Sequence, residues 1–210
     1  MDCLKFFSVD SPLYRFMDGL KNMFLLNLCW LIGSLPIVTI GISTVAAFDV
    51  ALRMADNEEG YVMRQYFKAY KANWKQGLPL GLLMLACAYV LYLDVQIVAV
   101  SKEGNVGMLI AACVSAFVFV FSLLYAFALT ARYENTLPKI LHNSFRISMK
   151  YFFRSVFTLV IVGLEIAVFL WNYTTMFVGV LLGFGLVIYS VAVMAKPVFK
   201  RIEKDTAAGE

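Results

Sequence analysis

The sequence predicts an all-α integral membrane protein: a bundle of about five transmembrane helices with two amphipathic helices at the cytoplasmic interface. Hydrophobic residues make up 61% of the 210 positions and charged residues only 15%, whereas ordinary soluble domains contain about 25% charged residues. The apolar residues also form long uninterrupted blocks, which a soluble core of this size cannot bury. We expect one transmembrane domain, residues 22–195, between an interfacial segment, residues 1–21, and a cytoplasmic tail, residues 196–210.

The first 21 residues mix apolar side chains with a charge every few positions. This pattern is typical of an amphipathic segment that lies in the membrane interface. A basic start, a pure apolar centre and a small-residue cleavage site do not follow one another here. The segment is therefore expected to stay in the mature protein rather than to act as a signal peptide.

The first apolar block, residues 22–52, contains Asp49 as its only charged residue. As one helix it would measure about 45 Å, whereas the hydrocarbon core of a bilayer is only about 30 Å thick. Proline at position 36 removes a backbone N–H and crowds the preceding turn, so we expect a kink there. Lipid cannot hydrogen-bond the freed carbonyls, so this element should face protein or a wet cavity on at least one side. The predicted helix break consists of Gly33, Pro36, Thr39 and Gly41.

Four further spans are expected at residues 77–100, 106–131, 155–171 and 176–195. Short turns join the second span to the third and the fourth to the fifth, whereas residues 53–76 and 132–154 form longer, basic and aromatic connections. Each should contain a helix at headgroup level, with Phe67, Tyr70 and Trp74 on one face of the first. These helices either anchor the protein in the headgroups or dock a partner or anionic lipid. The candidate docking or lipid surface comprises Arg64, Lys68, Lys71, Trp74, Lys75, Arg146, Lys150, Phe153 and Arg154.

The charge distribution predicts the orientation. The two long connections carry five Lys and Arg residues each and the tail four, against one and none in the short turns, so the basic segments should be cytoplasmic. Five crossings then leave the N-terminus outside, which conflicts with the basic residues in segment 1–21. A re-entrant hairpin at the first block would remove the conflict, but its halves are about 15 residues each, shorter than the roughly 20 that a crossing needs.

An internal similarity favours the single crossing. A shift of 79 positions places Phe48 on Phe127, Arg53 on Arg132 and Trp74 on Phe153. Two units that run in the same direction form a parallel repeat, in which the first span crosses once as the third does. The alternative is that any two cytoplasmic connections share basic and aromatic residues.

Several stretches resemble the YesL-like bacterial membrane proteins: NLCWLIGSLPIVTIGISTVAAF, then NEEGY and YFKAYKANWKQG, and later ARYENTLPKILHNSFRISMKYF. The resemblance covers nearly the whole chain and is most specific in the broken first block. It implies a multi-pass protein of the bacterial cell membrane, often encoded beside carbohydrate uptake systems and polysaccharide-degrading enzymes. It further implies an accessory role with carbohydrate transporter subunits as partners, and it carries over no catalytic residue.

Three polar residues form the candidate intramembrane site. Glu165 lies near the middle of the fourth span, where a carboxylate is costly and faces a bundle interior or a cavity. Asp49 is four residues ahead of Arg53, a spacing typical of a structural ion pair, and Asn27 is placed to hydrogen-bond across helices. The alternative is that Glu165 is protonated or hydrogen-bonded and serves only the packing of helices.

No pattern indicates an enzyme, a cofactor, a metal site or nucleic-acid binding. P-loop, GxGxxG, GxSxG and HExxH motifs are missing from the sequence, and the lone His142 has no second ligand at metal spacing. Two functions stay open. One is an accessory or regulatory component associated with carbohydrate uptake, and the other is a small secondary carrier or channel with its pathway at the broken helix and Glu165.

Overall fold

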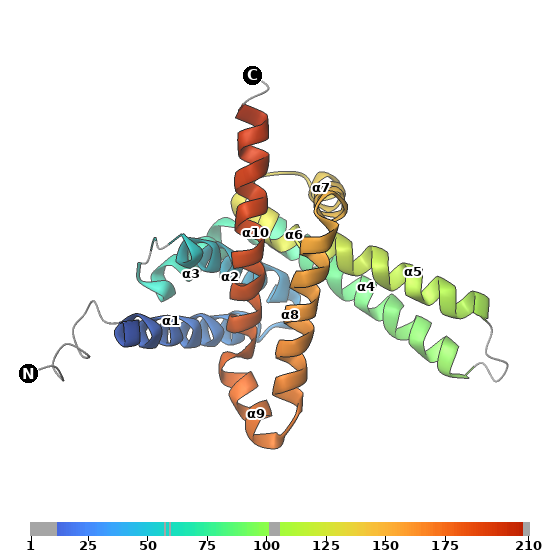
Figure 1. Cartoon of the computed structure of the whole chain (residues 1–210), viewed down its shortest axis with the longest axis horizontal. Coiled ribbons are helices and arrows are strands. Elements are labelled where there is room, and N and C mark those ends of the chain that lie inside the picture. The colour runs from blue at the N-terminus through green and yellow to red at the C-terminus, as the bar shows by residue number, and fades with distance from the viewer. Residues whose placement is uncertain (1–11, 57, 59, 101–105, 208–210) are drawn as a thin grey trace, which may run out of the picture.

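The computed structural model describes residues 12–56, 58, 60–100 and 106–207, and within them the chain is helical without a strand. Residues 1–11 of the predicted interfacial segment lie outside the described part. Figure 1 shows the arrangement of the elements. In chain order they are α1 (Pro12–Gly33), the 3₁₀ turn η1 (Ile37–Thr39), α2 (Ile40–Ala55), α3 (Val62–Ala72), α4 (Trp74–Val100), α5 (Val106–Leu123), α6 (Ala126–Arg132), α7 (Leu137–Lys150), α8 (Phe152–Leu170), α9 (Tyr173–Val178), the π-helical segment η2 (Gly179–Gly183) and α10 (Phe184–Ala207).

Five helical stretches are long and apolar enough to cross a membrane, which confirms the predicted number. They are Ile37–Ala55, Trp74–Ala99, Val106–Arg132, Phe152–Leu170 and Tyr173–Lys204. The last stretch continues without interruption past residue 195, so the predicted fifth span and the first part of the predicted tail form one helix. The two predicted interfacial helices are α3 and α7, whose polar and apolar residues lie on opposite sides.

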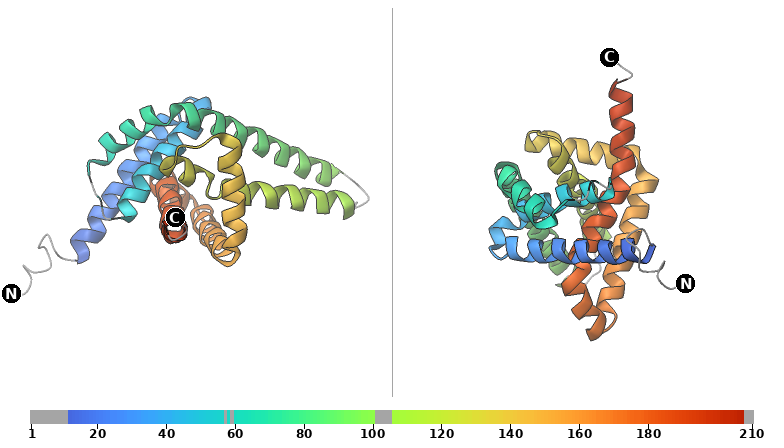
Figure 2. Two further views of the ribbon diagram at one scale, coloured as in Figure 1. Left: turned by 90° about the horizontal axis from the view of Figure 1, so that it is seen from above. Right: turned by 90° about the vertical axis from the view of Figure 1, so that its left-hand side faces the viewer.

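The first apolar block is not a single kinked crossing, contrary to the prediction. It forms a helical hairpin in which α2 runs back beside α1 (Figure 2). Trp30 Nε1 donates to Thr44 Oγ1 at 3.1 Å, and Ser43 Oγ donates to the Trp30 carbonyl at 2.9 Å. Residues 14 positions apart in one continuous helix would be separated by about 20 Å. The reversal occurs at Pro36, which adopts an extended conformation with φ −77° and ψ 118° because its ring excludes the helical hydrogen bond.

A crossing of α1 beside α2 in this hairpin would be a sixth, in addition to the five apolar stretches, and six crossings place both ends of the described chain on one side of the membrane. We expect cysteines introduced at Lys21 and Lys204 to react with a membrane-impermeant thiol reagent from the same side, in a background without the native cysteines. Labelling from opposite sides would instead show that the first apolar block crosses the membrane once. Both positions are exposed, so the label can reach them without unfolding.

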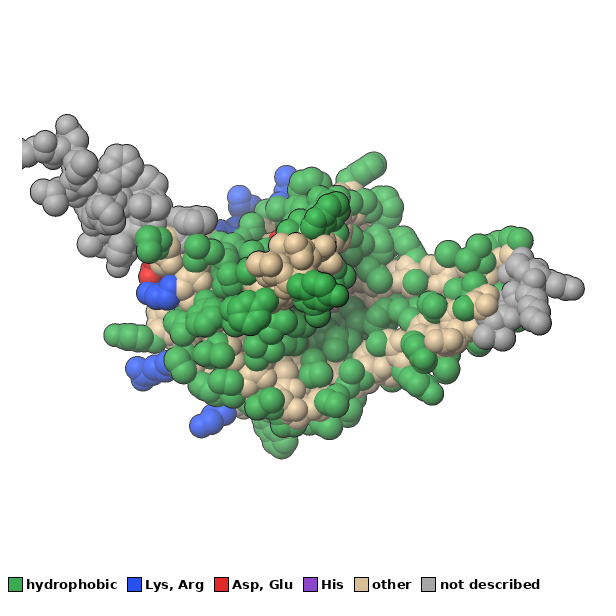
Figure 3. Space-filling model, turned by 90° about the horizontal axis from the view of Figure 1, so that it is seen from below, with side chains coloured by type: hydrophobic (Ala, Val, Ile, Leu, Met, Phe, Trp, Pro, Cys, Tyr) green, Lys and Arg blue, Asp and Glu red, His purple; other side chains and the backbone are tan. Residues whose placement is uncertain are grey.

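Helix α2 forms the centre of the molecule. In an apolar window of 18 residues, 61% of the residues of this stretch are buried, against none in the window of the α4 stretch and 6% in that of the α5–α6 stretch. It packs against α1, α3, α4, α6 and α10. The α4–α5 pair and the α8–α10 pair project from this centre as two separate arms (Figure 1). Hydrophobic side chains cover much of the face seen from below (Figure 3), as expected for surface that contacts lipid.

The predicted repeat is supported by a contact between equivalent positions. The rings of Phe48 on α2 and Phe127 on α6 stack with centroids 6.4 Å apart and planes at 10°. A residue touches its own counterpart when two units face each other across a local two-fold axis. The interfacial helices match with an offset of 78 rather than 79: buried Val62 and Tyr66 of α3 correspond to buried Ile140 and Ser144 of α7.

Candidate functional site

The carbonyl groups freed at the helix break are bound by side chains of the protein. Thr39 Oγ1 lies 2.8 Å from the Gly33 carbonyl and 2.7 Å from that of Pro36. The Tyr70 hydroxyl, from α3, donates to the Gly33 carbonyl at 3.4 Å. The break therefore faces α3 on one side, while Leu35 at the turn is 79% exposed.

A buried tyrosine on α3 completes this arrangement. Tyr66 is fully buried, and its hydroxyl forms a hydrogen bond with Ser43 Oγ at 2.6 Å. Burial raises the pKa of the Tyr66 phenol, so the group stays neutral and available for hydrogen bonding. The sequence analysis placed Tyr70 on one face with Trp74, but α3 ends at Ala72 and Trp74 begins α4. The spacing of Tyr66 and Tyr70 by one helical turn is the feature of the sequence that could have indicated two tyrosine hydroxyls on one face of α3.

Replacing Tyr66 with Phe is expected to lower the free energy of unfolding by about 1 kcal/mol, because one buried hydrogen bond is lost while the ring is kept. The measurement is chemical or thermal unfolding of the detergent-solubilised protein. Tyr61→Phe is the matched control, since Tyr61 is 85% exposed. Equal unfolding of the two variants would show that the Ser43–Tyr66 bond does not stabilise the hairpin.

Gly41 has a different role from the one predicted. It lies inside α2 rather than in the break, and it contacts the start of α4. A Cβ atom on Gly41 would lie 2.3 Å from the Gly77 carbonyl oxygen and 2.4 Å from Gly81 Cα. Gly77 and Gly81 are four residues apart on α4, the spacing that lets membrane helices approach closely.

Asn27 connects α1 to the π-helical segment. Its side chain is 1% exposed; Nδ2 donates to the Val180 carbonyl at 2.9 Å and Oδ1 accepts from the Gly185 amide at 3.1 Å. The neighbouring Trp30 stacks on Phe184 with ring centroids 4.0 Å apart. These contacts are the cross-helix hydrogen bonds expected of Asn27, and they fix α1 across the start of α10.

Glu165 and Asp49 have separate partners. Glu165 Oε1, on α8, accepts a hydrogen bond from Ser190 on α10, whereas its Oε2 is buried and has no hydrogen-bond partner among the described residues. Asp49 pairs with Arg53, with 3.1 Å between Oδ2 and Nε. The three predicted polar residues therefore have three different sets of neighbours. In the described part of the chain, no three His, Cys, Asp or Glu side chains are grouped as metal ligands.

The predicted docking surface is largely open. Trp74 is 54% exposed and Phe153 89% exposed, and the basic side chains of α3 and α7 are exposed around them. Arg154 differs, because it is half-buried and its Nε has no hydrogen-bond partner among the described residues. We call the part of the molecule that carries α3, α7 and the end of α10 the basic side.

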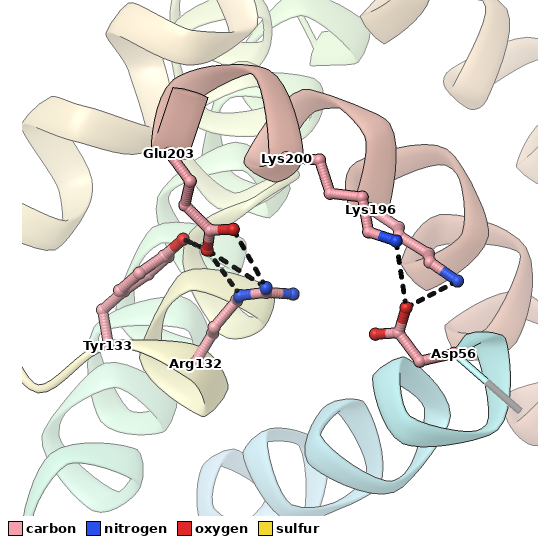
Figure 4. Close-up of polar contacts among 6 residues, drawn as sticks. All are labelled: Asp56, Arg132, Tyr133, Lys196, Lys200 and Glu203. Atoms are coloured by element: carbon pink, nitrogen blue, oxygen red, sulfur yellow. Dashed lines mark hydrogen bonds and ion pairs between the residues drawn. The ribbon is translucent and has the colours of Figure 1, made fainter. Parts of the chain in front are cut away.

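The end of α10 is held on the basic side by two ion-pair groups that the sequence analysis did not predict (Figure 4). We call them the C-terminal clasp. In the first group, Asp56 Oδ1 lies 2.7 Å from Lys196 Nζ and 3.4 Å from Lys200 Nζ. In the second, Glu203 accepts from Arg132 Nε at 3.0 Å and from the Tyr133 hydroxyl at 2.6 Å. Burial, and then Glu203, raise the pKa of Tyr133 to about 12, which keeps its hydroxyl protonated as a donor.

The clasp should weaken in acid. The hydrogen bond from Lys196 lowers the pKa of Asp56 below its ordinary value of 3.8. The unfolded chain then takes up a proton at higher pH than the folded one, so the contribution of Asp56 is present above pH 3.8 and is lost as the pH falls through the folded pKa. We expect the melting-temperature difference between the unmodified protein and Asp56→Asn to be constant near neutrality and to shrink below about pH 4. The exposed Glu134→Gln is the control, and a difference that did not change in acid would exclude this ion pair as its source.

Similar proteins are known for much of this chain. Residues 23–95, which include the break, α2, α3 and most of α4, match the family described as "Protein of unknown function, DUF624". Over 146 residues the chain is 29% identical to "Uncharacterized protein YesL" of Bacillus subtilis (strain 168), an alignment that covers 67% of this chain and 68% of that protein. No solved structure matches. These similarities confirm the resemblance to the YesL-like proteins indicated by the broken first block, and the chain has the five long apolar helices of a helical membrane protein.

Proposed function

We propose that this protein is a non-enzymatic accessory or regulatory component of the bacterial cell membrane, associated with carbohydrate uptake, that docks a transporter subunit through its basic side. One observation carries the proposal: the exposed aromatic residues Trp74 and Phe153 stand at equivalent positions of the two repeats. Trp74 is the first residue of α4 and Phe153 the second residue of α8, and both apolar helices directly follow a basic interfacial helix.

Exposed aromatic rings beside cationic side chains suit a protein interface. Large aromatic and arginine side chains supply much of the binding energy at interfaces. Topological anchoring requires only that such rings lie at headgroup level. The two repeats present the same elements, so a partner that contacts one of them has a second, similar contact available. The link to carbohydrate uptake rests on the YesL-like resemblance.

The test is cross-linking in native membranes followed by purification and mass spectrometry of the attached proteins. We expect carbohydrate transporter subunits to be recovered with the unmodified protein and to be lost with Trp74→Ala/Phe153→Ala. The matched control is Trp171→Ala/Tyr173→Ala, which removes rings that are 87% and 89% exposed at the other end of α8. Recovery that is equal for both double variants would contradict docking through the basic side.

A second candidate function is a small secondary carrier, and the buried Oε2 of Glu165 is the observation that favours it. An intramembrane carboxyl group with one free oxygen suits proton or cation coupling. This candidate predicts solute flux into liposomes that contain the purified protein alone, abolished by Glu165→Gln. Flux that persisted in this variant would remove Glu165 from the pathway.

A further inference from the structure

A polar cavity of about 500 Å³ lies between α2 and α3 on the basic side. It is lined by Asp49, Arg53, Arg64, Gln65, Lys68, Ala69, Ala72 and Asn73. We call it the basic cavity. Its volume falls within the range of about 300–1,000 Å³ that is common for small-molecule sites.

The described residues that line the cavity carry more positive than negative charge. Its one carboxylate, Asp49, is bound through both oxygens by Arg53, at 3.1 and 3.3 Å. Arg64 and Lys68 are exposed and form no ion pair within the described residues. They are four residues apart on α3, where like charges repel and disfavour the helix. An anion between them would relieve this repulsion.

The second repeat contains a related cavity of about 470 Å³ between α6, α7 and the end of α10, which contributes Phe199 and Ile202 to its lining. Its lining matches the basic cavity at the offset of 78: Asn143 corresponds to Gln65 and Arg146 to Lys68. Beside it, Arg132, the counterpart of Arg53, binds the Glu203 carboxylate of α10. The second repeat thus receives an anionic group from a distant part of the chain. In the first repeat, Arg53 pairs with Asp49 of its own helix. The two cations on α3 therefore have no anionic partner among the described residues.

We propose that the basic cavity binds a phosphate group. A phosphate monoester carries more negative charge than a carboxylate and a lipid phosphodiester carries the same single charge, and both have several strong acceptor oxygens. A guanidinium beside an ammonium matches that set of acceptors. The side-chain amide of Gln65 adds a further polar group to the lining. The phosphate belongs either to an anionic lipid headgroup or to a soluble phosphate ester, because both present the same chemistry. The proposal does not depend on docking of a transporter subunit, since Trp74 and Phe153 do not line the cavity.

The test uses the purified full-length chain in a neutral detergent. Binding of inorganic phosphate and of a hexose phosphate is measured by calorimetry, and retention of phosphatidylglycerol, compared with phosphatidylcholine, by native mass spectrometry. Arg64→Gln/Lys68→Gln is compared with Arg201→Gln/Lys204→Gln. The control removes one arginine and one lysine from exposed positions of α10 that do not line the cavity.

We expect at least one probe to bind, and Arg64→Gln/Lys68→Gln to weaken that binding about tenfold or more, because charged hydrogen bonds are lost. The control should stay within about twofold. Selective loss of phosphatidylglycerol identifies a headgroup site, and selective loss of a soluble phosphate identifies a soluble ligand. The proposal is overturned if no probe binds the unmodified protein, or if both double variants lose binding equally. Unchanged melting temperatures confirm that both variants are folded.

Discussion

Gly81→Ala should destabilise the protein by about 1–3 kcal/mol, the usual cost of overpacking a close contact. A Cβ atom on Gly81 would lie 2.5 Å from Gly41 Cα and 2.7 Å from its amide nitrogen. Both are backbone atoms and cannot rotate away, so α2 and α4 must separate. Alanine favours a helix over glycine by roughly 1 kcal/mol, so helix propensity cannot explain a loss. The measurement is the free energy of unfolding in detergent.

Gly163→Ala provides the matched control. Gly163 lies inside an apolar helix, α8, as Gly81 does in α4, but an added Cβ would meet nothing within 4 Å. We expect the free energy of unfolding of this variant to be unchanged or slightly higher, because the helix propensity of alanine is the only effect of the substitution. If Gly81→Ala were as stable as Gly163→Ala, the two helices would not pack backbone to backbone at Gly41.

Phe199→Ala should cost about 3–5 kcal/mol, the range for removing a large aromatic side chain from a packed core. Phe199 is fully buried under the C-terminal clasp. Its ring packs edge-on against Tyr133 at 6.1 Å between centroids, and the Arg132 guanidinium lies 6.0 Å from its centroid. The cavity left by its loss would separate α10 from α6. We expect a lower melting temperature and proteolytic cleavage near the end of α10.

The control for this prediction is Phe153→Ala, which removes the same side chain from a position that is 89% exposed. Its stability in detergent should be unchanged, while the proposed docking of a partner is impaired. If Phe199→Ala melted at the temperature of Phe153→Ala, the end of α10 would not be part of the folded core.

Much of the molecule could be predicted from the sequence. Long apolar blocks predict helices in a membrane because lipid leaves no other partner for backbone polar groups, and five such helices are present. The amphipathic patterns of residues 53–76 and 132–154 identified α3 and α7. Pro36 also located the break to within a few residues, since its ring excludes a helical hydrogen bond regardless of its surroundings.

Other features depend on contacts between distant residues. A proline at the middle of an apolar block is compatible with a kink or with a reversal, and the predicted kink was wrong. The hydrogen bonds that join Trp30 to Ser43 and Thr44, together with those of Tyr66 and Tyr70, stabilise the hairpin. Glycine residues likewise predict close packing only once their neighbours are known.

The sequence by itself determined the membrane character, the number of apolar helices, the site of the break and the YesL-like resemblance. These follow from residue type and local spacing, which act within a few turns of helix. Only the tertiary structure decided the reversal of the first block, the packing of Gly41 on α4, the C-terminal clasp and the basic cavity. Each of these joins side chains from different helices, and nothing in local spacing specifies which helices meet.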